Sequence, residues 1–501
     1  MAARLTGMTG EPGTLRDALI ARGRADPSRL AYDDGARQIS YGQLAETADE
    51  QAARLASMGV RQGDRVALAM SSGIPFAQAF WALQLLGATP AAFNPTAPAE
   101  TVERRASLVR PRLLLTDDWL ATAPPANGTP ADPQVTPDDI AFLQPTSGTS
   151  GDPRAAQIRH RNVLAYLRAS GEDGHVSRDD VLVSWVPPWH DFGLVRFVIG
   201  SVFPGAPCHI VQPAIRTIPD WLATITRTRG TMTGAPDFCY RLATRMVDPA
   251  SVDLSSLRLA SNGGEPVRSS TIELFERRFG VSGVVLPAYG LAEATLGVTT
   301  VLPGEALVAD AHGNVSNGRP LSGLEVRVDG DASAPGEILV RGNVVFAGYF
   351  DAVDETERCL RDGWLHTGDV GYLDSEGRLF VLGRERSMIK RAGAVVAPRE
   401  LEEAALQVEG VRVAAAVGIP ARSGVTETIA VVVEADRRHE SAAETLSGAV
   451  SREIAAQLGF APGQVTVVPP RTLPHTENGK VRHDRVRALL LDGSIDSTAA
   501  G

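Results

Sequence analysis

The sequence predicts an α/β protein with a large N-terminal domain of several subdomains, built on mainly parallel sheets with a β-rich subdomain, and a small mobile α+β domain at the C-terminus. Three observations support this prediction. The 501 residues are more than one hydrophobic core usually serves. Apolar strand-like runs alternate with helix-like stretches up to about residue 300. Beyond that point the pattern changes twice, first to strands and turns and then to a short α+β unit.

The N-terminal elements follow from local patterns. Residues 65–70 form an apolar run typical of a buried strand, and residues 76–87 carry apolar side chains at helical spacing. Residues 112–115 predict another strand, and the Pro-rich, polar residues 121–137 predict a surface connection. The alternation continues with strands expected over 181–186, 257–261 and 284–286, and helices over 158–170, 218–229 and 269–279.

The C-terminal third has a different pattern. Between about 300 and 380 we expect strands and turns without helices, at 325–328, 337–340 and 378–381. The last unit then predicts helices over 399–408 and 442–458, and strands over 411–417, 429–433 and 465–468. We therefore expect a large domain over 1–382, a hinge over 383–387, a small lid domain over 388–490 and a disordered, polar tail over 491–501.

Composition excludes several classes of function. The net charge is 49 − 59 = −10 and no long basic run occurs, which argues against nucleic acid as a partner. No run of 18 apolar residues and no apolar core of signal-peptide length is present, so we expect a cytoplasmic protein without membrane insertion. The three cysteines stand far apart without a CxxC motif, which indicates neither a disulfide framework nor a zinc site.

Residues 146–154 have the composition of an anion-binding loop. Glycines allow a close backbone approach, and successive N–H groups with hydroxyls form an anion-binding nest. Arg154 adds a cation with forked donors that suit phosphate. A plain polar turn explains the stretch equally well when it is taken alone. A Walker A loop is excluded because GxxxxGK[ST] is absent. The other candidate phosphate-binding residues are Thr146, Ser147, Gly148, Thr149, Ser150 and Gly151.

Five further motifs follow this loop in order. They are NGGEP at 262–266, AYGLAEAT at 288–295, HTGD at 366–369, GR at 383–384 and NGK at 478–480. Together the six resemble the adenylate-forming superfamily of acyl-CoA synthetases, peptide-synthetase adenylation domains, luciferases and fatty acyl-AMP ligases. The resemblance runs from about residue 15 to residue 487. Residues 184–194 look most like fatty acyl-AMP ligases, but the insertion that those enzymes usually carry before TGD is missing from 354–364.

The resemblance implies a reaction. A carboxylic acid and ATP would give an acyl-adenylate and pyrophosphate, with Mg²⁺ as the second cofactor. The acyl group would then pass to the phosphopantetheine of an acyl carrier protein, to CoA or to an amine. Two alternatives stay open: an acyl-CoA ligase, and an inactive nucleotide-binding relative. Intact Lys480, Glu293 and Asp369 disfavour the inactive relative, whereas Arg154, in place of the usual Lys, is its only support.

The resemblance also implies residue roles. Lys480 would stabilise charge developing on the α-phosphate and the acid. Glu293, together with Thr149, would hold Mg²⁺, a cation that takes oxygen ligands. His190 would act as a gate beside the acid, and Arg386 would be the pivot of the hinge. The nucleotide would also contact Gly264, Glu265, Tyr289, Gly290, Asp369 and Arg384, and the acid pocket would include Trp189, Phe192, Arg196, Asp237, Gly263, Leu291 and Ala292.

Arg196 stands where fatty acyl-AMP ligases tend to have a small residue. One hypothesis is that it narrows the acyl tunnel or pairs with an anionic group of the substrate. The alternative is an arginine that faces solvent. The acid itself is not readable from the sequence, so a long acyl tunnel and a short pocket for a functionalised acid both stay open.

Overall fold

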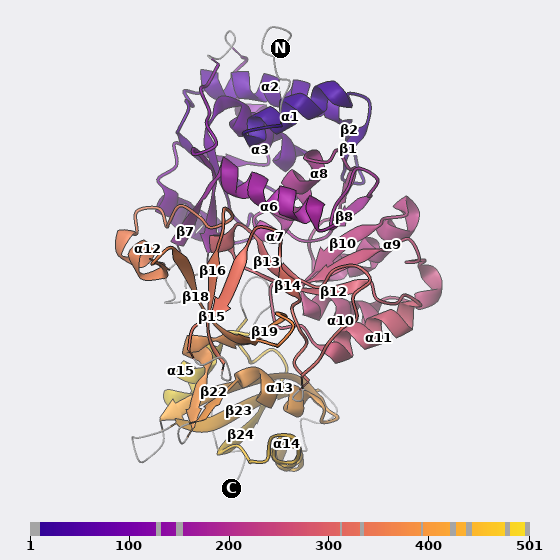
Figure 1. The fold of residues 1–501 in the computed structure, drawn as a ribbon, viewed down its shortest axis with the longest axis vertical. Helices are drawn as coiled ribbons and strands as arrows, with labels where there is room; N and C mark the ends of the chain where they lie inside the picture. Colours follow the sequence, from indigo (N-terminus) through magenta and orange to yellow (C-terminus); the bar gives the residue numbers. More distant parts are fainter. Residues whose placement is uncertain are drawn as a thin grey trace. The chain divides into compact units, whose positions relative to one another are not determined.

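The computed structural model confirms the α/β fold class (Figure 1). It divides into two compact units: unit 1 comprises Met1–Arg327, Leu339–Thr367 and Leu373–Phe380, and unit 2 comprises Val328–Ile338, Gly368–Tyr372 and Val381–Gly501. Two short segments thus cluster with the C-terminal residues although they precede residue 382. The structure describes residues 11–126, 132–146, 154–310, 313–330, 335–391, 394–420, 427–436, 443–475 and 481–495.

The first sheet of unit 1 has the strand order β5-β3-β4-β6-β7. Its neighbours pair in parallel except β6 and β7, which are antiparallel. Helix α3 (Ile74–Leu86) is apolar on all sides and almost wholly buried, as expected for a helix inside a core. The strands are β3 (Arg65–Ala69), β4 (Thr89–Ala92), β5 (Leu113–Thr116), β6 (Ile140–Thr146) and β7 (Arg154–Arg159).

The second sheet of unit 1 has nine strands in the order β14-β13-β12-β11-β10-β8-β9-β1-β2. The six neighbours from β12 to β1 all pair in parallel, so their carboxyl ends lie at one edge of the sheet. The strands are β1 (Leu30–Asp33), β2 (Gln38–Ser40), β8 (Leu182–Ser184), β9 (Cys208–Ile210), β10 (Met232–Ala235), β11 (Leu259–Asn262), β12 (Val285–Gly290), β13 (Gly297–Thr300) and β14 (Arg319–Pro320).

Helices cover this sheet. Figure 1 shows α9 (Ile218–Thr228), α10 (Asp237–Met246) and α11 (Ser269–Phe279) beside β10 and β12, where they enclose a core that includes Trp221 and Tyr240. Arg196, on the π-helical segment η3 (Leu194–Ile199), donates hydrogen bonds to Tyr166 of α6 (His160–Glu172) and to Ser261 of β11.

Two local predictions are corrected in unit 1. The helix expected over 158–170 begins only at His160, because residues 154–159 pair with β6 as strand β7. Arg154 therefore stands on a strand, opposite Thr146. A short helix, α12 (Val353–Cys359), lies in the segment expected to lack helices. None of its residues is buried, so it has no apolar stripe by which the sequence could reveal it.

A β-rich sheet follows in the order β15-β16-β18-β17, with β19 paired to β18. Its strands are β15 (Glu325–Val328), β16 (Gly336–Arg341), β17 (Leu360–Arg361), β18 (Trp364–Leu373) and β19 (Leu379–Arg384). The C-terminal part of unit 2 contains a second sheet, β22-β23-β24, and a two-stranded one, β20-β21. Its elements are β20 (Ile389–Arg391), β21 (Ala394–Val396), α13 (Pro398–Leu406), β22 (Val411–Pro420), β23 (Glu427–Ala435), α14 (Ala443–Leu458), β24 (Gln464–Val468) and α15 (His483–Leu491).

The C-terminal tail begins later than the sequence predicted. Ile495 is buried in a cluster with Val432 and Val486, so the first residues after α15 are held against the sheet. Residues 496–501 lie outside the described part of the chain.

Glu402 ties three elements of unit 2 together. Its Oε1 accepts a hydrogen bond from the backbone N–H of Ala416 at 2.9 Å and lies 2.6 Å from Nε2 of His483. Burial lowers the pKa of His483, but the charge of Glu402 and the hydrogen bond to it outweigh burial, so the pKa lies above its ordinary value of 6.5. The pair thus links α13, β22 and α15 most strongly when His483 is protonated.

We expect this pair to make the stability of unit 2 depend on pH. Because the folded pKa of His483 is raised, its contribution is complete below the unfolded pKa and is lost as pH rises through the folded pKa. Calorimetric scans between about pH 6 and pH 9 should therefore show a falling transition temperature for unit 2. Glu402→Gln should flatten this dependence. An equal fall in that variant would assign the effect to other groups.

Candidate functional site

The loops at the carboxyl edge of the nine-stranded sheet carry most of the predicted site residues in unit 1. Trp189 and His190 follow β8, Gly264 follows β11, and Glu293 follows β12. In open α/β sheets, ligands bind beyond the carboxyl ends of parallel strands. The topology of unit 1 therefore gathers these residues at the edge where a ligand site is expected.

Glu293 belongs to a small group of polar side chains in unit 1. The hydroxyl of Tyr349 donates a hydrogen bond to Oε1 of Glu293 at 2.6 Å. The guanidinium of Arg154 lies 5.4 Å from the centre of the Tyr349 ring, and its Nη2 is 3.8 Å from Glu355. Burial and the neighbouring charge of Glu293 raise the pKa of Tyr349, which keeps the phenol neutral and able to donate. The structure thus brings Arg154 to the ring and Glu293 to the hydroxyl of one tyrosine.

Tyr349 is not among the site residues that the sequence predicts. Its only local signal is a glycine followed by two aromatic residues, which is also typical of ordinary core packing. Its role becomes visible only through contact with Glu293, which is 56 residues away along the chain.

The carboxylate of Glu293 fits a magnesium ligand. Tyr349 occupies Oε1, and among the described residues no hydrogen-bond partner is found for Oε2. Mg²⁺ is usually held by one or two carboxylates together with phosphate oxygens and water. The described part of the chain contains no group of three or more His, Cys, Asp or Glu that could hold a metal ion by itself. Thr149, the other predicted ligand, lies outside the described residues.

The backbone after Glu293 is strained. Thr295 is fully buried with a φ of 68°, a conformation that β-branched residues rarely adopt. Its hydroxyl donates to the carbonyl of Val344 at 2.6 Å. Position 290, just before this segment, must be glycine, because a Cβ there would lie 1.7 Å from the carbonyl oxygen of Leu296. Strain of this kind persists where surrounding contacts over-determine the backbone, as at ligand sites.

The predicted adenine loop is built from glycines. A Cβ at Gly263 would lie 2.8 Å from the carbonyl oxygen of Ala288. Gly264 has a φ of +83° and faces open space. Glu265 accepts a hydrogen bond from the N–H of Phe238 at 2.6 Å, which fixes the loop. A backbone without side chains allows the close approach of a flat ring, which is what the prediction for this loop requires. Tyr289, the predicted stacking residue, is mostly buried on β12.

The acid-side residues lie around α7 (Asp191–Gly193). Nδ1 of His190 is 2.6 Å from Oδ1 of the buried Asp191, while the imidazole stays about a third exposed, at 32%. The carbonyl of Trp189 accepts a hydrogen bond from the side chain of Gln144 at 3.1 Å. Phe192 packs against Gly234, where a Cβ would lie 2.6 Å from the ring. Leu291 and Ala292 are buried beside Glu293.

The burial and contacts of Asp237 argue against its predicted place in the acid pocket, whereas for Arg196 only the solvent-facing alternative is excluded. Asp237 is fully buried and both its oxygens are engaged: Oδ1 accepts from Asn262 and from the backbone of Arg268, and Oδ2 accepts from Thr271 and the Arg268 guanidinium. Its carboxylate therefore joins α10, β11 and α11 and does not face a substrate. Arg196 is also buried, which excludes the solvent-facing alternative.

Unit 2 holds a second part of the predicted site. Nε of Arg384 lies 2.7 Å from Oδ1 of the buried Asp369. The N–H of Gly368 donates to Glu337 at 2.9 Å. Arg386 is exposed in η7 (Glu385–Ser387), next to Gly383, which has a φ of +147°. The predicted residues Ser147, Gly148, Thr149, Ser150, Gly151 and Lys480 lie outside the described residues.

We expect Arg154→Lys to retain activity within about tenfold, a change of roughly 1.4 kcal/mol in the barrier. Lysine keeps the positive charge but loses the forked donors and the planar contact with Tyr349. Steady-state kinetics of pyrophosphate release would measure the change. An inactive lysine variant would show that Arg154 does more than neutralise phosphate.

The chain is similar to known AMP-binding enzymes and ligases over most of its length. The model of the AMP-binding enzyme family matches residues 20–350, and that of the AMP-binding enzyme C-terminal domain matches 400–480. The chain is 32% identical to a putative ligase of Mycobacterium tuberculosis, over 88% of this chain and 93% of the relative. It is 28% identical to a medium-chain-fatty-acid–[acyl-carrier-protein] ligase of Moorena producens, over 74% of this chain and 70% of the relative.

A solved structure shows the same fold. It comes from a study of fatty acyl-adenylate ligases from E. coli and L. pneumophila and superposes with a TM-score of 0.83 at 28% identity, covering 96% of this chain and 98% of the other. No described helix combines the length and apolar character needed to span a membrane.

Proposed function

Because the chain belongs to the AMP-binding enzyme family, whose members form acyl-adenylates, we propose that it activates a carboxylic acid with ATP and passes the acyl group to a phosphopantetheine thiol. The observation that carries the proposal is the contact of Glu293 with Tyr349 beside Arg154. It provides an oxygen ligand for Mg²⁺ and a fixed cation for phosphate in one place.

The reaction needs positioning and charge neutralisation more than covalent chemistry. Arg154 and the loop before it neutralise the leaving pyrophosphate, and Glu293 contributes one oxygen ligand to Mg²⁺. Asp369 accepts hydrogen bonds from the ribose hydroxyls, with Arg384 beside it. Lys480 stabilises the charge that develops at the α-phosphate. Bound Mg²⁺ supplies charge neutralisation at the phosphates.

This proposal has two versions, which differ in the acceptor of the acyl group: a carrier protein or CoA. The similarity to a carrier-protein ligase supports a carrier protein. The short connection from α12 through β17 to β18 supports a CoA ligase, since fatty acyl-AMP ligases usually carry an insertion there. A phosphopantetheine arm is common to both acceptors.

Acid-dependent exchange of labelled pyrophosphate into ATP tests the first step, and its complete absence with a broad panel of acids would refute the proposal. The second step is then measured separately with CoA and with a phosphopantetheinylated carrier protein. Transfer to only one of them identifies the acceptor. If neither accepts the acyl group, an amine is the remaining candidate acceptor.

A further inference from the structure

Arg196 is a charged side chain enclosed in the interior of unit 1. It lies on η3, and only 8% of its surface is exposed. Its Nε has no hydrogen-bond partner within the described part of the chain. Arginine stays protonated under all ordinary conditions, so the charge persists in this enclosure. A buried charge without a counter-charge is energetically unfavourable, which makes the surroundings of Arg196 informative.

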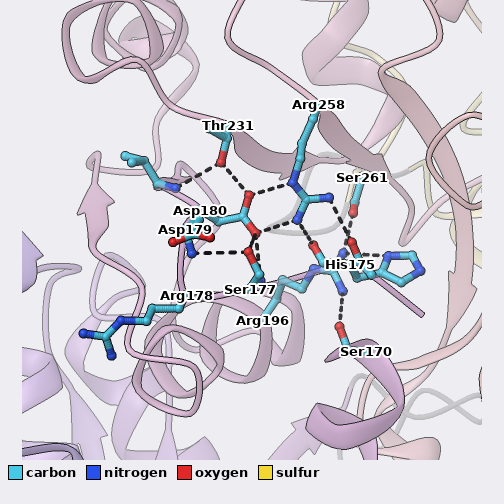
Figure 2. A network of polar contacts seen from close by, with 12 residues as sticks. Ser170, His175, Ser177, Arg178, Asp179, Asp180, Arg196, Thr231, Arg258 and Ser261 are labelled. Carbon is cyan, nitrogen blue, oxygen red and sulfur yellow. Dashed lines mark hydrogen bonds and ion pairs between the residues drawn. The ribbon is translucent and has the colours of Figure 1, made fainter. Parts of the chain in front are cut away.

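The direct partners of Arg196 are all neutral. Nη1 donates to the hydroxyls of Tyr166 at 2.9 Å and Ser170 at 3.3 Å, and Nη2 donates to the hydroxyl of Ser261 at 3.0 Å. Nη2 also lies 3.5 Å from Nδ1 of His175. Figure 2 shows Arg196 between Ser170, His175 and Ser261. None of the ion pairs found among the described residues includes Arg196.

His175 does not supply the missing negative charge. It is 1% exposed, and burial together with the charges of Arg196 and Arg258 lowers its pKa from 6.5 to about 3. Because a guanidinium only donates, Nδ1 of His175 acts as the acceptor and Nε2 carries the proton. This Nε2 is also buried, and no hydrogen-bond partner for it is found among the described residues. The enclosure therefore holds two unsatisfied donors.

The nearby carboxylate is already neutralised. Asp180, visible in Figure 2, accepts hydrogen bonds from Arg258 at 2.7 and 2.5 Å. It also accepts from the hydroxyls of Thr231 and Ser177. Arg258 therefore has a full counter-charge, whereas Arg196 has none among the residues that the structure describes. The difference between these two arginines points to an external anion for Arg196.

The position of Arg196 connects this enclosure to the candidate acid site. Arg196 follows His190 and Phe192 in the same segment after β8. Ser261, which it contacts, directly precedes Asn262 and the loop of Gly263 and Gly264. Arg196 and Ser261 therefore belong to the same two segments that carry residues predicted for the acid and the nucleotide.

We propose that Arg196 binds a second, anionic group of the substrate, so that the acid activated by this protein is a short dicarboxylic acid. This inference rests on the proposed adenylation of a carboxylic acid. One carboxylate reacts with ATP and the other pairs with the guanidinium, where a bidentate carboxylate satisfies forked donors. Ser170 and Ser261 add hydroxyls, and Nε2 of His175 provides a further donor.

The test compares straight-chain dicarboxylic acids of about four to eight carbons with monocarboxylic acids of the same lengths. We expect wild-type kcat/KM for pyrophosphate release to favour the best diacid by at least about a hundredfold, because a site built for a polar group rejects an analogue without it. Arg196→Met should abolish this preference while monoacids still react. Arg216→Met, at an exposed arginine, is the control and should keep the preference.

The outcomes separate the two proposals. Wild-type preference for monoacids would overturn the role of Arg196 and leave adenylation intact. Lack of pyrophosphate release with every acid would overturn both. If Arg196→Met does not fold, Arg196→Lys and Ser261→Ala serve instead: each should reduce the diacid preference by about tenfold, and an unchanged preference in both would overturn the inference.

Discussion

Replacing Glu293 with Gln is expected to slow acid-dependent pyrophosphate exchange by about 10²–10³-fold. Glutamine keeps the size of the side chain and an oxygen that can accept from Tyr349. It removes the negative charge that makes the carboxylate a ligand for Mg²⁺. The loss should therefore come with a higher Mg²⁺ requirement, while the fold of unit 1 stays unchanged.

Two matched variants sharpen this test. Tyr349→Phe leaves the charge of Glu293 but removes the hydrogen bond that orients it, so we expect about a tenfold loss and a higher Mg²⁺ requirement. Glu355→Gln removes another carboxylate near Arg154 and should stay within about twofold. If Glu293→Gln is active and Glu355→Gln is inactive, the metal ligand is Glu355 on α12 and not Glu293.

Asp237→Ala is expected to destabilise unit 1 by about 3–5 kcal/mol, because it removes the fully buried carboxylate of an ion pair with Arg268 and leaves the buried donors of Asn262 and Thr271 without this acceptor. The carboxylate accepts from Arg268, Asn262 and Thr271, and the side chains of Asn262 and Thr271 are buried, so water cannot readily replace the carboxylate there. Asp237→Asn keeps acceptor capacity and should lose less.

Denaturant unfolding of the full chain, followed by tryptophan fluorescence, measures this effect. Trp221 lies in the same hydrophobic cluster as Tyr240 of α10, so its fluorescence responds to unfolding of this core. Asp220→Ala, at an exposed carboxylate in the first turn of α9, is the control and should change stability by less than about 0.5 kcal/mol. Unchanged stability with altered acid preference in Asp237→Ala would restore the pocket role that the sequence suggested.

Much of the fold was predictable because its signals are local. The apolar helix of residues 76–87 and the amphipathic helix of residues 269–279 follow from side-chain periodicity, which adjacent residues carry by themselves. Helix α12 and the strand character of residues 154–159 were not predictable. Helix α12 has no buried residue, so it shows no apolar periodicity. Residues 154–159 are a strand because they pair with β6.

The sequence by itself determined the α/β class, the adenylate-forming family and the order of its motifs, since glycines and charged residues at characteristic spacings are readable along the chain. Only the tertiary structure decided what Asp237, Tyr349 and Arg196 contact. Their partners Arg268, Glu293 and Ser261 lie 31, 56 and 65 residues away. Whether a charged side chain is buried, and whether it meets an opposite charge there, is set by such distant segments, so no local pattern encodes it.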